Sequence, residues 1–384
     1  MSESVLGCAE GYTAAIHWRG GARSFVAEST LVGLTACSWS RTLNDTSDAR
    51  IVVAKGNASP DCCAALGQVE PWVHELTIYR DGELVWQGPV TKVTEHRDSV
   101  AVEAQDVYAW LDKLVNTSLI RYVDASGPDG RYRAPVTHIA WNILRLNLGD
   151  TLSQPHDYPA VMDYIVRRDP AEQVRFEKDG THNKSIWNAY VGDIWRELAK
   201  RGLTWTAVGR SLLLRSRPTT STVALARLEL DHILGDVEVI KDGASAATYG
   251  WATTQQEQDI EDGLTVGTGR TGTPYGRLDT LVKVQGQETS AADLRQAARE
   301  AVAGRYPVPV TISVPDGSQL SPLAPVGVEG LVPGERVDVV TETFCTSVGQ
   351  GFALTDVAAE WGDGGEKIGI TLVPLADVDE AVVQ

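Results

Sequence analysis

The sequence predicts a mainly β protein with an α+β insert, in which two β domains bracket a mixed α/β region. Short strand patterns punctuated by turn signals occupy residues 1–112, and similar patterns resume over residues 223–384. Between them, residues 113–222 carry apolar side chains at helical spacing. Many short strands at this spacing are typical of a barrel or a sandwich. We therefore expect three domains, with boundaries after residues 112 and 222.

The first domain contains the strongest local signal, a hairpin turn at Asp81-Gly82. An Asp-Gly pair between two alternating apolar runs favours a two-residue turn, so residues 72–80 and 83–86 should pair with one face of the ribbon buried. Asp106 precedes a short apolar run and is expected to cap a helix that ends at Asp112. Further strands are predicted at residues 12–18, 24–26, 90–95 and 99–103.

The middle region has two amphipathic patterns, which predict helices over residues 136–146 and 185–200. Gly202 supplies a left-handed cap after the second helix. Residues 203–207 and 211–215 then read as the two strands of a hairpin. The polar stretch that follows, up to residue 222, marks the boundary of the insert.

The last domain returns to strands and contains one helix, predicted over residues 291–303. A segment rich in Gly, Thr and Asp, residues 255–276, is expected to be a long loop and is the candidate for a moving element. Strands are predicted at residues 236–240, 280–285, 308–314, 336–340, 351–359 and 367–372.

Composition excludes several classes of function. The 384 residues include 34 basic and 51 acidic side chains, a net charge of -17. Such a charge disfavours electrostatic capture of nucleic acid or of an anionic membrane surface. No stretch approaches the roughly 18 apolar residues of a membrane helix, and no secretory leader is visible at the start. We expect a protein made and folded in a cytoplasm, without a membrane anchor.

Cysteine and aromatic usage point to structure rather than to chemistry. The five cysteines lack CxxC spacing, so reduced thiols are expected. There are 11 Trp and 11 Tyr against 4 Phe, a bias toward rings with a polar atom. Most of the Trp positions fall on apolar phases of strands or helices, which favours a core or a subunit interface over a ligand platform. The Trp positions are 18, 39, 72, 86, 110, 141, 187, 195, 205, 251 and 361.

One short motif matches a nucleotide-binding fingerprint, Gly267-Thr-Gly269-Arg-Thr-Gly272. The fingerprint functions only between a strand and a helix whose N-terminus receives the pyrophosphate. Thr273-Pro274 follows it and no helical pattern begins there. A flexible loop is the better interpretation, and no cofactor is predicted.

Candidate catalytic and metal-binding residues are weak. The histidines, at positions 17, 74, 96, 138, 156, 182 and 232, show no pairing at metal-ligand spacing. His156-Asp157 with Ser153 lacks the turn that exposes a hydrolase nucleophile. Acidic pairs that a glycosidase would need are abundant by default in so acidic a chain, for example Asp231 with Asp236 and Glu335 with Asp338. We predict no catalytic, cofactor-binding or metal-binding residues and therefore no enzyme.

Three groups of segments together resemble a known family, the minor tail proteins of actinobacteriophages with long flexible tails. This siphovirus group is related to the baseplate hub proteins. The resemblance spans most of the chain, through turn and strand signatures rather than catalytic motifs. The segments that carry it are Cys37–Asp45, Ala49–Val53, Glu70–Trp72 and Leu76–Val90; then Asp193–Trp205; then Ser313–Leu320, Leu331–Val337, Trp361–Lys367 and Ile370–Pro374.

The resemblance implies a tail-tip hub in the virion. Two barrel-like β domains with an inserted α/β region would form a ring of three copies around the tail lumen. The implied partners are the distal tail protein, the tape measure protein and other minor tail proteins, with DNA only in passage. An acidic chain fits a channel through which DNA must pass without sticking. Only ten residues follow Pro374, so we expect no appended enzymatic domain.

Two alternatives come from other classes of protein. One is a receptor-binding tail-tip module that stacks host carbohydrate on exposed Trp or Tyr rings. The other is a cell-wall hydrolase with a cryptic carboxylate or histidine site. Exposed aromatic faces would favour the first, and clearing of host cell walls would favour the second.

Overall fold

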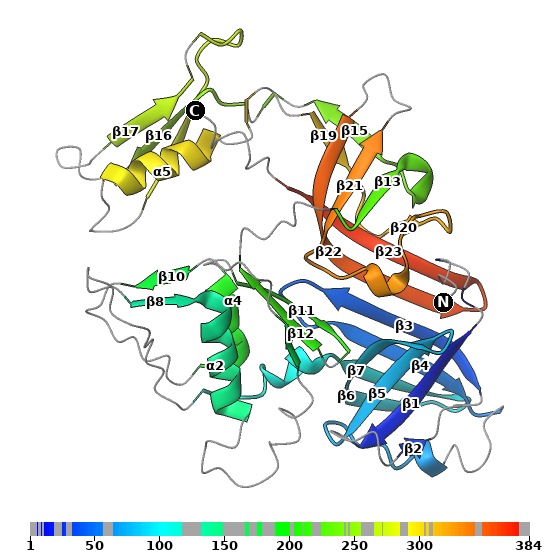
Figure 1. Ribbon diagram of the computed structural model, residues 1–384. Coiled ribbons are helices and arrows are strands. Elements are labelled where there is room, and N and C mark those ends of the chain that lie inside the picture. Colours follow the sequence, from blue (N-terminus) through cyan, green and yellow to red (C-terminus); the bar gives the residue numbers. More distant parts are fainter. Residues whose placement is uncertain are drawn as a thin grey trace. The chain divides into compact units, whose positions relative to one another are not determined.

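The computed structural model (Figure 1) divides into two compact units by the contacts between residues. Unit 1 comprises residues 1–235, 315–338 and 353–373, and unit 2 comprises residues 236–314, 339–352 and 374–384. The structure describes residues 6, 9, 11–18, 25–27, 33–56, 64–116, 132–148, 166–168, 175–178, 189–199, 203–209, 211–216, 224–241, 243–244, 246–254, 265–270, 272–284, 291–302, 305–306, 310–341 and 348–375.

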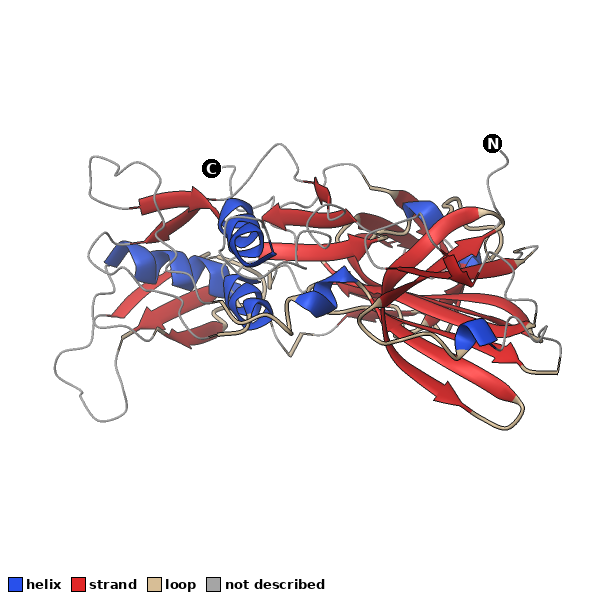
Figure 2. Cartoon of the chain, turned by 90° about the horizontal axis from the view of Figure 1, so that it is seen from below, coloured by secondary structure: helices blue, strands red, loops and turns tan. Residues whose placement is uncertain are grey.

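A 13-stranded sheet is the main element, with strands from both ends of the chain. Its strand order is β14-β20-β23-β22-β3-β4-β7-β6-β5-β1-β2, and β13 and β21 join it at β22. Figure 2 shows how far strands predominate over helices. The strands are β1 (Tyr12–Trp18), β2 (Phe25–Ala27), β3 (Leu34–Thr42), β4 (Asp48–Ala54), β5 (His74–Arg80), β6 (Glu83–Glu95), β7 (Ser99–Gln105), β13 (Ala226–Glu229), β14 (Ile233–Leu234), β20 (Ser318–Leu320), β21 (Arg336–Thr341), β22 (Val348–Gly362) and β23 (Gly365–Pro374).

The two predicted β regions meet through β3 and β22. These strands pair antiparallel, from Thr42 opposite Asp356 to Cys37 opposite Trp361. The path of paired strands runs from β14 to β2 and does not close on itself among the described residues. The mainly β class is confirmed, while the barrel-like form of each β domain is not. The boundaries after residues 112 and 222 stay predictions, because a division by contacts does not identify independently folding domains.

The predicted hairpin at Asp81-Gly82 is confirmed, and both turn residues have positive φ, 50° and 87°. The burial expected for this ribbon was wrong. Instead of one buried face, β5 is buried on both, so that Glu75 and Thr77 lie inside with Leu76. A register shift follows Ile78, and it leaves Leu84 beyond the turn exposed while Trp86 is buried. Local alternation did not reveal the second layer that covers β5.

The insert packs around aromatic rings. Its elements include β8 (Tyr132–Pro135), α2 (Val136–Leu148), β9 (Val166–Arg168), β10 (Arg175–Lys178), α4 (Val191–Ala199), β11 (Leu203–Val208) and β12 (Ser211–Ser216). Tyr108, Trp195 and Trp205 lie in one buried cluster with apolar residues of α2 and β12. This cluster also includes residues of the short 3-10 helix η1 (Val107–Trp110), which follows β7. The insert therefore shares a hydrophobic core with the segment directly after β7.

The helical predictions in the insert hold in their centres and differ at their ends. The helix expected at 136–146 is α2, which extends to Leu148. The helix expected at 185–200 is described as α4, Val191–Ala199, and the one expected between Asp106 and Asp112 is η1, Val107–Trp110. The second helix begins at Val191 rather than at residue 185: residues 185–188 lie outside the described residues, and Tyr190 bridges to Val115 in β geometry. Asp106 caps a 3-10 helix instead of an α-helix.

Unit 2 contains a small sheet of three strands, β17 (Thr265–Gly269), β16 (Tyr249–Thr253) and β18 (Asp279–Lys283), with α5 (Ala291–Val302) packed against it. A separate pair joins β15 (Glu238–Lys241) to β19 (Val310–Ser313). The helix predicted at 291–303 is confirmed. The long loop predicted at 255–276 was wrong in part: residues 265–269 form β17, and residues 255–264 lie outside the described residues.

Among the helices in the described part of the chain, none is both long enough and apolar enough to cross a membrane.

A buried ion pair ties β5 to β23. The Nε of Arg80 donates to Oε1 of Glu366 at 2.6 Å and its Nη2 donates to Oε2 at 2.7 Å. The Tyr12 hydroxyl on β1 also donates to Glu366, at 2.7 Å. Burial opposes the charged carboxylate, yet the bonds from Arg80 and Tyr12 outweigh it and keep the pKa of Glu366 below its usual value. The pair is therefore ionised at neutral pH, and both carboxylate oxygens of Glu366 accept from Arg80.

We expect Arg80→Met to lower the free energy of unfolding by about 3–5 kcal/mol at pH 7, because it leaves the Glu366 carboxylate buried without its cation. Urea unfolding followed by circular dichroism measures the effect. Arg336→Met is the matched control: Arg336 and Asp338 form an ion pair of 2.7 Å with side chains about a third exposed, where loss costs about 0–1 kcal/mol. Equal effects of the two substitutions would contradict the assignment.

Candidate functional site

The glycine motif lies in a strand of unit 2 and not at a helix start. Gly267 and Gly269 of β17 stand opposite Trp251 and Tyr249 of β16. A Cβ at Gly267 would come within 2.7 Å of ring carbons of both aromatic residues. The glycines thus make room for two rings, and the next element after them in the described chain is the strand β18. The expectation of a loop is wrong for Gly267 and Gly269, which lie in the edge strand β17, whereas Gly272 lies beyond that strand.

The candidate ligand residues are dispersed. Among the described residues no three His, Cys, Asp or Glu side chains are grouped to hold a metal ion. Ser153, His156 and Asp157 lie outside the described residues, as does His182. His17 and His74 are buried in unit 1, whereas the other described histidines, 96, 138 and 232, are partly or fully exposed at separate places.

Of the two acidic pairs considered for a glycosidase, one has arginine partners. Glu335 forms an ion pair with Arg215, and Asp338 forms one with Arg336. Asp231 lies in the 3-10 helix η2 (Leu230–His232) of unit 1, while Asp236 belongs to unit 2. Glu335 and Asp338 are thus each matched by an arginine, and Asp231 and Asp236 belong to different units.

An open cleft of about 340 Å³ lies over β3, β4, β22 and β23. Arg50, Glu360 and Lys367 give it charges of both signs, and Trp361 adds a half-buried ring. Its one thiol is that of Cys37, whose pKa burial raises to about 12. This thiol stays protonated near neutral pH and is a poor nucleophile.

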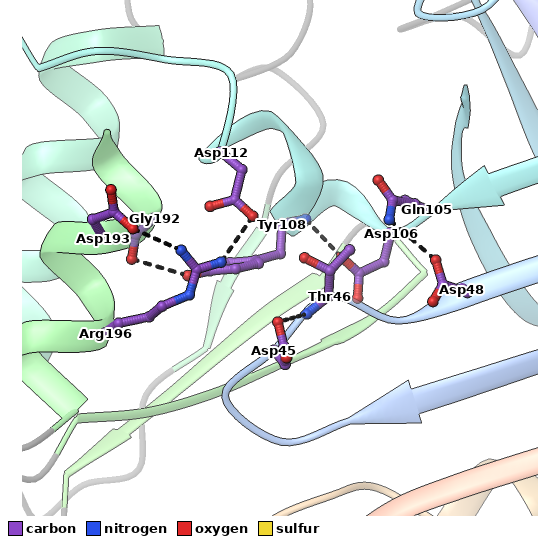
Figure 3. A network of polar contacts seen from close by, with 10 residues as sticks. All are labelled: Asp45, Thr46, Asp48, Gln105, Asp106, Tyr108, Asp112, Gly192, Asp193 and Arg196. Atoms are coloured by element: carbon purple, nitrogen blue, oxygen red, sulfur yellow. Dashed lines mark hydrogen bonds and ion pairs between the residues drawn. The ribbon is translucent and has the colours of Figure 1, made fainter. Parts of the chain in front are cut away.

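A network of polar contacts in unit 1 joins the sheet to the insert (Figure 3). We call it the junction network; it consists of Asp45, Thr46, Asp48, Gln105, Asp106, Tyr108, Asp112, Gly192, Asp193 and Arg196, with Ser47 beside them.

Asp106 is the buried centre of the junction network. It follows β7 directly, and its Oδ1 accepts from the Tyr108 N–H at 2.9 Å while Oδ2 accepts from the Ser47 N–H at 2.9 Å. The carboxylate thus binds the start of η1 and the turn between β3 and β4. Burial raises the pKa of Asp106 to about 6, against the lowering effect of these hydrogen bonds.

Tyr108 and Arg196 continue the network into α4. The Tyr108 hydroxyl donates to the Gly192 carbonyl at 3.2 Å, and its ring stacks on Trp205 at 5.2 Å between centroids. Arg196 donates to Asp112 at 2.9 Å and to Asp193 at 3.0 Å. Its guanidinium lies 6.0 Å from the Tyr108 ring centroid. Two elements far apart in sequence are therefore held by both charge and ring contacts.

A second set of contacts, which we call the β11 seam, joins β11 to the turn after β3. Asn44 N–H donates to the Trp205 carbonyl at 2.8 Å, and Trp205 N–H donates back to the Asn44 side chain at 3.0 Å. Thr206 adds a hydroxyl bond to the Thr42 carbonyl at 3.1 Å. Asn44 has φ of 64°, a left-handed conformation that asparagine tolerates. The sequence analysis missed this seam, although Asn44-Asp45 is a turn signal that could have marked it.

The arrangement couples two parts of unit 1, the sheet and the insert. Its chemistry is the matching of donors to buried acceptors. Most of the described tryptophans with buried indoles lie in this region or in the sheet, while Trp18 is 49% exposed and its ring lies 4.6 Å from that of His74, between centroids. The buried tryptophans are Trp39, Trp86, Trp110, Trp195 and Trp205, and Trp187 lies outside the described residues.

We expect Asp106→Asn to flatten the pH dependence of stability. With a folded pKa of about 6 against an ordinary 3.8, the wild-type carboxyl favours folding most below pH 4, and this contribution is lost as pH rises through 6. The free-energy advantage of wild type over Asp106→Asn should shrink by about 2–3 kcal/mol between pH 4 and pH 7. Urea unfolding at a series of pH values measures it.

Asp193→Asn, which removes an exposed carboxylate of the same network, is the control and should keep the wild-type slope, because Asp106 is retained. Parallel stability curves for wild type and Asp106→Asn over this range would contradict the raised pKa.

Comparison of the sequence with known proteins gives no match to a family model and none to a curated protein. Comparison of the structure with solved structures does give matches. The 43 kDa tail protein of prophage MuSo2 from Shewanella oneidensis aligns with a TM-score of 0.55 at 13% identity, over 94% of this chain and 98% of that one.

Two further solved structures align over similar lengths. A tail protein from Neisseria meningitidis gives a TM-score of 0.54 at 12% identity, over 96% of this chain and 98% of that one. The prophage tail protein gp18 from Listeria monocytogenes gives 0.50 at 12% identity, over 94% of each chain. The fold that the resemblance implied, that of phage tail proteins, is confirmed, and the narrower actinobacteriophage group stays a prediction.

Proposed function

We propose that this chain is a structural protein of a bacteriophage tail. One observation carries the proposal: three tail proteins share its fold over at least 94% of its length. Because identities are 12–13%, the likeness lies in the architecture, which is where a structural protein has its function. The virion tail is accordingly the place where we expect the protein.

Within the tail, we propose the tip, where three copies form a hub ring around the lumen as a minor tail protein of a siphovirus. Two features support this role. Both β regions belong to one continuous sheet, which suits the wall of a ring, and the junction network fixes the insert to that wall. A net charge of -17 repels the phosphates of DNA in passage. The partners would be the distal tail protein, the tape measure protein and other minor tail proteins.

The proposed mechanism is mechanical and needs no catalytic residue or cofactor. A ring of rigid subunits would hold the lumen closed and pass on a change triggered at the tip by rigid-body movement. The receptor-binding alternative requires free aromatic faces for carbohydrate. In the described residues, the Trp18 ring contacts His74 and Arg277 lies over the Trp251 ring. Trp18, Tyr190 and Tyr275 are 43–49% exposed, and we keep this alternative in second place because the three structures that share the fold are tail proteins.

We expect the purified protein to form a trimer of 41.4 kDa chains. Light scattering across a concentration series measures the mass, and negative-stain imaging of the same peak should show rings. Obligate contacts between subunits make such assembly depend on concentration. A strict monomer at the highest concentration would contradict self-assembly of the ring.

Two further measurements separate the alternatives. Gold-labelled antibody against the protein should bind at one end of the tail in intact particles, and labelling elsewhere would contradict the proposed position at the tip.

The purified protein should leave the turbidity of host cell walls unchanged, whereas clearing would mean that it is an enzyme.

A further inference from the structure

The short helix η1 belongs by its packing to the insert, although it directly follows a strand of the main sheet. Its residues lie in the same buried apolar cluster as residues of α2, α4, β11 and β12. Backbone bonds join the segment after η1 to the start of α4: the Val191 N–H donates to the Leu114 carbonyl at 2.9 Å and the Gly192 N–H donates to the Leu111 carbonyl at 3.0 Å. We call η1 and the insert together the insert body.

The turn between β3 and β4, residues 43–47, holds the insert body through polar contacts at two places. At the start of η1, the Asp106 N–H donates to the Ser47 carbonyl and the Ser47 N–H donates to Oδ2 of Asp106, both at 2.9 Å. At the β11 seam, Asn44 and Trp205 exchange hydrogen bonds in the same reciprocal way. One short turn of the sheet therefore binds both ends of the boundary.

An aromatic pair and an ion pair add to this boundary. The ring of Trp72, on the sheet side, lies edge-on to Trp110 of η1 at 4.9 Å between centroids. Arg215 of β12 pairs with Glu335, which precedes β21. Separation of the boundary would break these contacts and the bonds of the turn, whereas the apolar cluster lies within the insert body. Polar bonds broken in this way are exchanged for bonds to water, which makes their net cost modest.

Asp106 is the residue at which the insert body leaves the sheet. It directly follows Gln105, the last residue of β7, and its backbone is extended before η1 begins. A Cβ at Gly88 of β6 would come within 2.8 Å of the Asp106 Cα, so the sheet fixes the position of this residue. The direction of η1 depends on the bonds of the Asp106 side chain to Ser47 and Tyr108.

The Asp106 carboxylate is buried without a cation. In the described part of the chain, its hydrogen bonds come from N–H groups and from the Ser47 side chain. Arg196 is bonded to Asp112 and Asp193 instead. Burial raises the pKa of Asp106 to about 6, so the ionised form gains from contact with water. The titratable side chains around it, from the β3–β4 turn, β4, η1, the segment after η1 and α4, are Asp45, Asp48, Tyr108, Asp112, Asp193 and Arg196 (Figure 3).

We propose that the insert body moves as one unit about Asp106, and that the β3–β4 turn is the latch that holds it against the sheet. Opening breaks the bonds of Ser47 with Asp106 and those of Asn44 with Trp205 together, because both sets belong to one turn. Loss of the Asp106 proton favours opening, since the ionised carboxylate is hydrated only when the latch is open. The inference goes beyond the proposed tail role, because it concerns motion within a single chain.

Native-state hydrogen exchange of the purified protein tests the latch. The boundary amides, whose N–H groups donate across the boundary, are those of Asn44, Ser47, Asp106 and Trp205. They should exchange through one shared opening. The amides of Val191 and Gly192 should be more strongly protected, because movement of the insert body leaves their bonds intact.

The opening should respond to pH in a direction set by Asp106. With a folded pKa of about 6 against an ordinary 3.8, the protonated carboxyl favours the closed latch, and this contribution is lost as pH rises through 6. From pH 5 to pH 7 the opening of the boundary amides should rise about tenfold, after correction for the intrinsic exchange rate. Asp106→Asn should abolish the rise, whereas Asp193→Asn, which removes an exposed carboxylate of the same network, should keep it.

Thr206→Val tests whether the boundary opens as a whole. It removes the hydroxyl bond to the Thr42 carbonyl at the β11 seam and does not touch Asp106, yet it should raise the opening of all the boundary amides about two- to tenfold. Thr204→Val is the matched control on the same strand, because the Thr204 hydroxyl bonds to the Arg215 carbonyl within the β11–β12 hairpin. It should leave that opening unchanged. Circular dichroism checks that both variants fold.

Three results would overturn the latch. The first is protection of the boundary amides equal to that of Val191 and Gly192. The second is a rise in exchange of both sets in Thr206→Val, which would mean that the insert unfolds and does not move as a body. The third is the same pH dependence in wild type and Asp106→Asn. The tail role is not at stake in these measurements, because they are made on the isolated chain.

Discussion

The antiparallel pairing of β22 with β3 is the constraint on which the rest of unit 1 depends. It joins segments near the two ends of the described chain, and the nearby contact between Tyr12 and Glu366 closes a loop of 354 residues. Closing a loop of this length costs conformational entropy, although the cost grows only slowly with length. Backbone hydrogen bonds between the two strands and buried polar contacts such as that of Tyr12 with Glu366 offset part of this cost.

Arg41 makes three buried polar contacts next to this pair of strands. It lies on β3, 2% exposed, and its Nη groups donate to the carbonyls of Val328, Leu331 and Val85 at 2.8–3.0 Å. Burial lowers the pKa of Arg41 to about 10, which still leaves it charged at neutral pH. The three carbonyls come from β6 and from the segment around the 3-10 helix η3 (Val328–Gly330), so the guanidinium joins β3 to both. It therefore specifies the register between chain segments that hydrophobic packing alone would define less sharply.

Local patterns predicted what local interactions determine. The Asp81-Gly82 turn, α2 and α5 depend on residues close in sequence, and each was found. The burial of Glu75 depends on tertiary packing over β5. Arg80 and Glu366 lie 286 residues apart in sequence, so no window along the chain contains both partners. Asp106 is intermediate. Its capping role follows from sequence, whereas its bond to Ser47 needs the sheet to be formed.

The strand β17 shows the same limit from the other side. Gly267 and Gly269 have low strand propensity by themselves, and the sequence analysis read them as loop. Their strand exists because Tyr249 and Trp251 need neighbours without side chains. Arg277 lies over these two rings. The two glycines, which have no side chains, therefore help to determine where the guanidinium lies. Buried Arg41 and Arg80 donate to carbonyl and carboxylate oxygens inside the protein, whereas Arg277 lies on the surface against two aromatic rings.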